Sequence, residues 1–522
     1  MTPAAPQAAA RDGDWWNCPR FIAAALFLAA LPLLWPSIPP LIDLPSHMAS
    51  YHIAASLDSS ATLRQYFEFH WQLIGNLGVD LVAVPLAKAL GAELATKLVV
   101  ILIPVLTVAG MLWVAREIHG EIPPTAGFVL PLAYCYPLHF GFLNYCFSMA
   151  LMLLAFALWL RTVPWRRHAW RVALFAVLAL AVWIAHAVGW GLLALACLVS
   201  DVQRRVARGQ AWPAALARAA ATCAPLGTPL IVMACLPSHG SPGLVGWFVW
   251  PELAKWLVTL FRDRWLALDL ADAAVFYAVL LVAVAARGGL RLRPALAVPA
   301  LAMLAIFFVV PQGINDATFV NDRVAPYALA LLALAIGTPG ATGRQRRRWA
   351  AAAAAFFVAR IAATTASLAI YGASWDANLQ ALDHIPPESR VVAFSRVPCV
   401  HDFANWRSPR LYHLPSLALI RKDAFVNTEW QVNGLQLLRV KYAAALPFDS
   451  DPSEMVTVGC DMDGTMRYPQ SLERVPRAAF DYVWLLQIPA ALWPHEPDLE
   501  LVWSNGQSAL YRISHDSRPL AD

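Results

Sequence analysis

The sequence predicts a polytopic α-helical membrane protein with an extracytoplasmic α/β domain at its C-terminal end. Apolar residues make up 59% of the 522 residues and charged residues only 14%. A soluble enzyme, a disordered chain and a nucleic-acid-binding protein are excluded, because each needs far more polar or charged surface. Residues 373–522 contain 13 basic residues (Lys and Arg) and 18 acidic residues (Asp and Glu). The much longer segment 1–372 contains only 26 basic and 16 acidic residues. The charge density therefore divides the chain into a membrane domain, 1–372, and a water-soluble domain, 373–522.

Eleven segments are apolar and long enough to be predicted as membrane spans. They are residues 21–38, 95–115, 124–138, 141–160, 172–185, 188–200, 217–235, 269–286, 294–310, 324–338 and 349–371. The first is predicted as an anchor, because acidic residues precede it and no small-x-small cleavage site follows. The segments 77–92 and 251–265 are predicted as amphipathic helices on the outer membrane surface.

Lysine and arginine are distributed unevenly over the connections between these spans. Arginine clusters at 204–208 and 344–348 fall on one side. The basic residues assigned to the other side are Arg64, Lys88, Lys97, Lys255, Arg262, Arg264 and Arg323. The positive-inside rule assigns the arginine-rich side and the N-terminus to the cytoplasm. We therefore expect the C-terminal domain outside, on the periplasmic face of the inner membrane in a Gram-negative cell.

The C-terminal domain contains several runs typical of β-strands. Apolar, β-branched and aromatic residues concentrate at 390–396, 436–442 and 480–487. Asn505-Gly506 lies between two alternating apolar runs and predicts a hairpin with a type I′ turn. These runs predict an α/β domain.

The only cysteines of the C-terminal domain are Cys399 and Cys460. Because the predicted compartment is oxidising, the two are candidates for a disulfide. The alternative is a pair of free thiols.

The long first outer loop, 39–94, contains the main candidates for chemistry. Asp43 lies where the chain leaves the first span, and a partly desolvated carboxylate there can take a proton from a hydroxyl group. His47 and His52 follow, and they can orient Asp43, grip a phosphate or complete a metal site, although no spacing is diagnostic of a metal. The alternative is a solvated loop in which Asp43 caps a helix that has Pro45 in its first turn.

Basic residues at the predicted outer surface form a second group of candidates. Arg323 follows Asp322 at the start of a span, and a guanidinium at this level suits a bidentate grip on phosphate. Lys255 and Arg262 lie among tryptophans, which favours contact with a lipid headgroup. The alternatives are an interfacial Arg323 paired with Asp322 and an anchoring helix around Lys255.

Four further polar residues fall in or near the spans. His139, Asn144 and His186 lie at predicted outer ends, and Arg360 lies within the last span. Such groups are functional candidates because they are costly at membrane depth unless they are paired or hydrated. The alternative for each is a structural partner inside the protein.

The whole arrangement resembles the GT-C superfamily of membrane glycosyltransferases that use polyprenyl-phosphate sugars. The resemblance rests on the eleven spans, the first-loop sequence Ile42-Asp43-Leu44-Pro45-Ser46-His47 with its interfacial helices, and the outer α/β domain. It implies that Asp43 is the general base or orients the acceptor, with His47 beside it. It also implies that outer basic residues bind the donor phosphate. The matching positions are Arg323, Lys255 and Arg262, with Arg64 of the first loop as a further candidate.

The GT-C resemblance implies an inverting glycosyltransferase that modifies an envelope glycan, lipid or protein on the outer face. The outer loops between the predicted spans contain no clear second acidic pair such as D-D or D-x-E, so we expect a transfer that requires no metal or other cofactor. Two alternatives remain at this point, a transporter or flippase of a lipid-linked substrate and a non-catalytic membrane scaffold. A transporter typically shows repeated halves, and the sequence has no such repeat.

Overall fold

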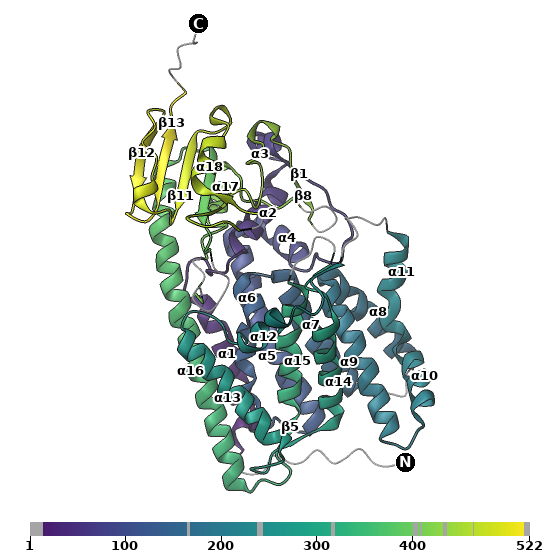
Figure 1. The fold of residues 1–522 in the computed structure, drawn as a ribbon. Coiled ribbons are helices and arrows are strands. Elements are labelled where there is room, and N and C mark those ends of the chain that lie inside the picture. Colours follow the sequence, from purple (N-terminus) through teal and green to yellow (C-terminus); the bar gives the residue numbers. More distant parts are fainter. Residues whose placement is uncertain are drawn as a thin grey trace. The chain divides into compact units, whose positions relative to one another are not determined.

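The computed structural model describes residues 14–163, 168–236, 244–314, 319–399, 406–407, 410–431, 436–462 and 464–515. The chain divides into two compact units (Figure 1). The helical unit comprises the described residues of Met1–Trp35, Leu73–Val79 and Val100–Ala366. The sheet unit comprises those of Pro36–Gln72, Asp80–Val99 and Ser367–Asp522.

Long apolar helices form most of the helical unit. Among the described residues, six stretches are long and apolar enough to cross a membrane. They are α5 (Ala92–His119), α7 (Leu143–Arg161), α9 (Ala187–Val206), α10 with α11 (Trp212–Cys223 and Thr228–Cys235), α13 (Leu266–Val284) and α16 (Gly343–Leu379) with the 3₁₀ turn η5 (Gln380–His384). The shorter apolar helices are α1 (Pro19–Leu34), α8 (His168–Ala185), α14 (Pro294–Val309) and the almost fully buried α15 (Val320–Leu334). A polytopic helical membrane fold is thereby confirmed.

The predicted span at 124–138 is wrong. This segment forms the 3₁₀ helices η2 (Ala126–Phe128) and η3 (Leu130–Tyr134), and then enters the short helix α6 (Tyr136–Phe140). Prolines near the starts of η3 and α6 explain the break, because proline has no backbone N–H to continue a helix. Each of the other ten predicted segments overlaps a helix.

Short helices occupy the two segments that we predict as surface helices. The first contains α4 (Asp80–Leu90), and the second overlaps α12 (Trp250–Val258). Helix α12 packs against α15 in the helical unit, and α4 packs against α2 (Leu44–Ser56) in the sheet unit.

A mixed seven-stranded sheet is the core of the sheet unit (Figure 1). Its strands are β6 (Arg390–Arg396), β7 (Phe425–Val426), β9 (Met455–Thr457), β10 (Met466–Arg467), β11 (Tyr482–Leu486), β12 (Leu499–Ser504) and β13 (Ala509–Ile513). Strand β6 pairs in parallel with β7, β9 and β11, while β13 pairs antiparallel with β11 and β12. All five residues of β11 are buried.

The predicted hairpin is present, but its turn differs from the prediction. Strands β12 and β13 pair up to Ser504 and Ala509, so four residues form the connection. Gly506 has a positive φ of 82°, whereas the φ of Asn505 is not positive. A type I′ turn needs positive φ at both central residues, so the prediction of that turn type is wrong.

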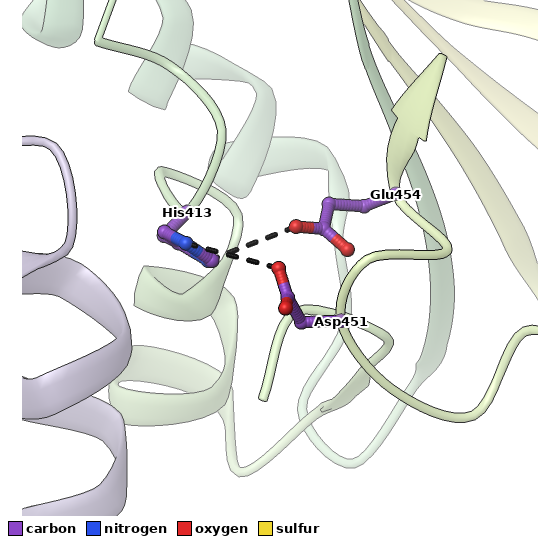
Figure 2. A group of neighbouring side chains, drawn as sticks. All are labelled: His413, Asp451 and Glu454. Carbon is purple, nitrogen blue, oxygen red and sulfur yellow. Dashed lines mark ion pairs between the residues drawn. The ribbon is translucent and has the colours of Figure 1, made fainter. Parts of the chain in front are cut away.

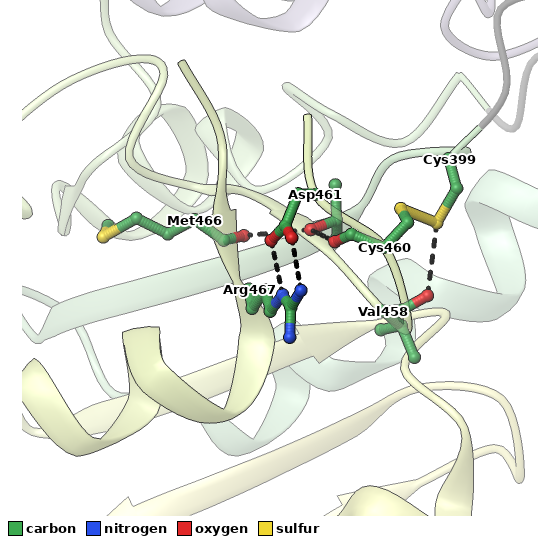
Figure 3. Close-up of a disulfide and its surroundings, with 7 residues drawn as sticks. Cys399, Val458, Cys460, Asp461, Met466 and Arg467 are labelled. Carbon is green, nitrogen blue, oxygen red and sulfur yellow. Dashed lines mark hydrogen bonds and ion pairs between the residues drawn. A yellow bond between two sulfur atoms is a disulfide. The ribbon is translucent and has the colours of Figure 1, made fainter. Parts of the chain in front are cut away.

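A disulfide joins Cys399 and Cys460, whose Cα atoms are 5.8 Å apart (Figure 3). It ties the segment after β6 to the segment after β9. Next to Cys460, Asp461 forms an ion pair with Arg467 at the end of β10.

Most of the first outer loop belongs to the sheet unit, and only its residues 73–79 belong to the helical unit. Its strand β1 (Phe67–Phe69) pairs antiparallel with β8 (Leu438–Val440), and its helix α2 packs against α17 (Ser416–Lys422). The compact units therefore do not follow the predicted boundary between residues 372 and 373. Pairing of β1 with a strand far along the chain is the physical reason.

Candidate functional site

Asp43 occupies the N-cap position of α2, and Pro45 lies in the first turn of this helix. An aspartate at this position usually accepts a hydrogen bond from the first turn. Here the Asp43 side chain makes no such capping bond, although it is only 8% exposed. Its Oδ1 atom lies 3.7 Å from Nε2 of His413. The carboxylate is thus directed toward another side chain instead of its own helix.

His413 lies between several carboxylates of the sheet unit. Its Nε2 atom is 3.9 Å from Oδ1 of Asp451, and its Nδ1 atom is 3.8 Å from Oε1 of Glu454 (Figure 2). The imidazole is 3% exposed, and burial lowers its pKa. We call His413, Asp451, Glu454 and Asp43 the carboxylate cluster.

The carboxylates of this region are deeply buried. Glu454 has no exposed surface, and burial together with the neighbouring Asp451 raises its pKa well above the usual range. Burial also raises the pKa of Glu429 to about 8, although Glu429 accepts a hydrogen bond from Ser46. Desolvation disfavours the ionised form of each group unless a positive charge is supplied.

A hydrogen-bonded turn fixes the segment around Thr428. The Asn427 side chain accepts a hydrogen bond from the backbone of Ala393 in β6, and it donates to Ser453. The hydroxyl groups of Ser416 and Thr428 are 2.7 Å apart. These contacts attach the turn both to the central strand and to the segment that carries Glu454.

Sequence reasoning missed His413, Glu429, Asp451 and Glu454. They come from segments far from Asp43 in the chain, and no short spacing connects them. The available signal was weak: polar side chains beside short apolar runs, as in Leu411–Thr428 and at Asp451–Glu454.

The other first-loop candidates have contacts of a different kind. The ring of His47 packs on Tyr51 and on Trp430, with centroids 6.1 and 4.9 Å apart. His52 pairs with Asp423 at 2.9 Å. Arg64 donates hydrogen bonds to two backbone carbonyls just after α2, Leu57 at 2.6 Å and Asp58 at 3.0 Å.

In the helical unit, two hydrogen-bond donors lie close together, the guanidinium of Arg323 and a ring N–H group of His186. Nδ1 of His186 accepts a hydrogen bond from the backbone N–H of Val188, so in the neutral ring Nε2 carries the proton. This Nε2 lies 3.5 Å from Nη1 of Arg323. An anion placed against both groups would accept a hydrogen bond from each of them.

Aromatic side chains hold the Arg323 guanidinium. It lies 4.2 Å from the ring centroid of Phe142 and 5.8 Å from that of Tyr145, whose hydroxyl donates to the Arg323 backbone carbonyl. Asp322 precedes it in α15 and is 3% exposed. Neither carboxylate oxygen of Asp322 accepts a hydrogen bond from the part of the chain that the structure describes.

Each of the remaining helical-unit candidates has contacts of its own. Asn144 accepts a hydrogen bond from Val79 and donates one to Asn76, so it fixes the backbone of that segment. His139 is buried in α6 with its ring near that of Tyr134. Lys255 pairs with Glu252 at 2.9 Å on α12, and Arg262 lies over the ring of Tyr136.

Arg360 has structural partners. Its Nη1 atom donates to Asp269 at 2.5 Å and to Asp272 at 3.1 Å, and Nη2 donates to the carbonyl of Phe261 at 2.7 Å. Asp263 lies 3.9 Å away. We call Arg360, Asp263, Asp269 and Asp272 the Arg360 cluster.

No protein-family model and no curated protein sequence matches this chain. Solved structures do match. The crystal structure of ArnT from Cupriavidus metallidurans bound to undecaprenyl phosphate shares 15% identity, with a TM-score of 0.51 over 96% of this chain and 98% of that one. The apo state of the same protein shares 16% identity, with a TM-score of 0.54 over 94% and 97% of the two chains.

These matches define a class of fold: a polytopic helical membrane part followed by a C-terminal mixed-sheet domain. The particular fold is similar to that of ArnT, and the predicted fold class is thereby confirmed.

Proposed function

We propose that this chain is an integral-membrane glycosyltransferase that takes a sugar from a polyprenyl-phosphate donor. The observation that carries the proposal is the match to ArnT, which was crystallised with undecaprenyl phosphate, over nearly the full length of both chains. The acceptor in this proposal is a glycan, lipid or protein of the cell envelope. The chain acts on the outer face of the inner membrane, with its N-terminus in the cytoplasm and its sheet unit in the periplasm.

In the proposed reaction, an acceptor hydroxyl oxygen attacks the anomeric carbon of the donor sugar. The bond between this carbon and the phosphate oxygen breaks, and the polyprenyl phosphate leaves with the electron pair. Asp43 accepts the hydroxyl proton. Its burial and the absence of a capping bond support this role, because they leave the carboxylate oriented away from its own helix.

Arg323 and His186 are proposed to bind the donor phosphate. Both present N–H groups, and a phosphate oxygen accepts strong hydrogen bonds from a guanidinium. The positive charge of Arg323 also offsets the negative charge that develops on the leaving phosphate. Lys255 and Arg262 are proposed to contact the lipid headgroup from α12 and the segment that follows it.

Reconstitution of the purified full-length chain in liposomes with a polyprenyl-phosphate sugar tests this function. Mass spectrometry of the lipid that co-purifies with the chain identifies the donor to use. We expect release of polyprenyl phosphate together with a glycosylated acceptor. A lipid-linked sugar that crosses the bilayer unchanged would instead indicate a transporter, and the absence of both turnover and bound lipid would indicate a scaffold.

A further inference from the structure

We propose that Trp256, Thr259 and Asp322 form a binding site for one hydroxyl group of the donor sugar. This inference rests on the proposed function, because it assigns a further contact to the same donor. Trp256 lies on α12, Thr259 directly follows this helix, and Asp322 lies in the first turn of α15, which packs against α12. All three residues belong to the helical unit. They line a small cavity together with Tyr136, Pro137, Leu260 and Pro326.

Each of the three side chains has a buried polar atom that makes no hydrogen bond with the described residues. These atoms are the indole Nε1 of Trp256, the hydroxyl oxygen of Thr259 and both carboxylate oxygens of Asp322. The three residues are only 6%, 3% and 3% exposed. A buried polar group without a partner is destabilising. Four such atoms on the residues around one cavity therefore indicate a ligand that supplies their hydrogen bonds.

The hydrogen-bonding character of these atoms matches a hydroxyl group. The N–H of Trp256 only donates, the carboxylate of Asp322 accepts, and the hydroxyl of Thr259 can do both. A ligand hydroxyl can accept from the indole and donate to the carboxylate at the same time. A phosphate group would be repelled by the negative charge of Asp322, and an apolar group would satisfy none of these atoms.

The size of the cavity limits what can enter it. Its volume of about 10 Å³ is close to the smallest that holds a water molecule. A sugar ring is too large, so we infer that the ring stays outside and inserts one of its hydroxyl groups. The competing occupant is a water molecule that is bound permanently inside the protein.

The neighbouring residue Arg323 relates this cavity to the proposed phosphate site. Consecutive residues of a helix point about 100° apart, so Asp322 and Arg323 face different directions. The Arg323 guanidinium lies over Phe142 and near His186, whereas Asp322 lines the cavity. Since the sugar is bonded directly to the donor phosphate, a donor held by Arg323 has its sugar close to residue 322.

The test is equilibrium binding of lipids to the purified full-length chain in detergent. The probes are undecaprenyl phosphate and its esters with glucose, mannose, galactose and arabinose. We expect the wild type to bind at least one ester more tightly than undecaprenyl phosphate alone. Asp322→Asn should weaken binding of that ester about 10- to 150-fold, as for loss of a hydrogen bond to a charged group. Trp256→Phe and Thr259→Val each remove a neutral hydrogen bond and should weaken it about 2- to 12-fold.

Undecaprenyl phosphate lacks the sugar and therefore controls for damage to the phosphate site. Trp256→Phe and Thr259→Val should bind it as the wild type does, and Asp322→Asn at least as tightly, because a negative charge beside Arg323 is removed. The matched protein controls are Trp247→Phe, at an exposed tryptophan, and Thr365→Val, at a threonine that donates to its own helix. Both controls should bind all probes with wild-type affinity.

The outcomes separate this site from the proposed function. Undiminished ester binding in Asp322→Asn, Trp256→Phe and Thr259→Val would overturn the site alone, as would equal losses for the ester and for undecaprenyl phosphate. A wild type that preferred no ester to undecaprenyl phosphate would also overturn the site alone. A wild type that bound none of these lipids would overturn the proposed function as well.

Thermal unfolding without lipid distinguishes a sugar hydroxyl from a permanent water molecule. Asp322→Asn and Thr259→Val keep the size of the side chain and alter atoms that have no partner among the described residues. We therefore expect both variants to unfold at the wild-type temperature. A clearly lower temperature in both would indicate a structural water molecule and contradict the proposal.

Discussion

The Arg360 cluster and the carboxylate cluster are both buried groups of acidic residues, but their counter-charges differ. In the Arg360 cluster, a permanently charged guanidinium donates directly to Asp269 and Asp272. In the carboxylate cluster, the central group is the imidazole of His413, and Glu454 accepts no hydrogen bond from the described residues. Burial of charge alone therefore does not identify a site. A cluster that is satisfied internally stabilises the fold, whereas one that lacks a counter-charge can bind a ligand.

Removal of the Arg360 cation is expected to have the largest effect on stability. Arg360→Met leaves buried aspartates without their hydrogen-bonded cation, which costs about 3 to 5 kcal/mol. Thermal unfolding in detergent measures the loss. The control is Arg348→Met, an exposed arginine of the same helix. If the Arg360→Met chain unfolded at the wild-type temperature, the Arg360 cluster would not stabilise the fold.

Loss of the disulfide is expected to have the next largest effect, and only in the sheet unit. The bond joins residues 61 apart, and the combined change Cys399→Ser and Cys460→Ser should cost about 2 to 4 kcal/mol. Hydrogen–deuterium exchange of peptides from β6 and β9 measures the local opening. Cys235→Ser, at an exposed free cysteine of the helical unit, is the control. Equal exchange in both variants would mean that the bond does not stabilise this sheet.

Arg323→Ala tests the anion-binding role in the helical unit. Loss of a hydrogen bond to a charged group costs about 1.5 to 3 kcal/mol, which corresponds to roughly a 10- to 150-fold higher KM for the donor. Arg323→Lys keeps the positive charge, so its KM for the donor should lie between those of the wild type and Arg323→Ala. Arg208→Ala changes an exposed arginine and serves as the control. An unchanged donor KM in Arg323→Ala would leave Arg323 with a structural role only.

The smallest effect is expected at His52. Its pair with Asp423 is partly exposed, with side-chain exposures of 19% and 38%, and such pairs contribute about 1 kcal/mol or less. His52→Ala should therefore unfold only slightly more easily and transfer sugar at the wild-type rate. A double-mutant cycle with Asp423→Ala measures the pair. A large loss of transfer activity would instead extend the active residues along α2 beyond Asp43.

Hydropathy predicted much of the helical unit because apolar length is a local property. The prediction was wrong at 124–138, where closely spaced prolines break an apolar segment into 3₁₀ turns. The three-residue pairing of β1 with β8 is too short to be predicted from the sequence, so the sequence did not show that most of the first loop belongs to the sheet unit.

Only part of the candidate site could be predicted from the sequence. The sequence makes Asp43 a candidate by its position after the first span, and Arg323 a candidate by its position before a later one. His413, Asp451 and Glu454 were missed because only tertiary structure brings them to Asp43. The role of Asn144 in fixing Asn76 and Val79 likewise depends on contacts distant in sequence.

The role of Asp43 as the general base is tested by a comparison of Asp43→Asn with Asp58→Asn in the reconstituted transfer assay. Both changes remove a carboxylate from the same loop, but Asp58 is exposed beyond α2 whereas Asp43 is buried. Loss of a general base lowers the rate by about 10²- to 10⁴-fold. We predict a loss of this size for Asp43→Asn, with unchanged thermal unfolding, and wild-type transfer for Asp58→Asn. Transfer by Asp43→Asn at the wild-type rate would contradict a general-base role for Asp43.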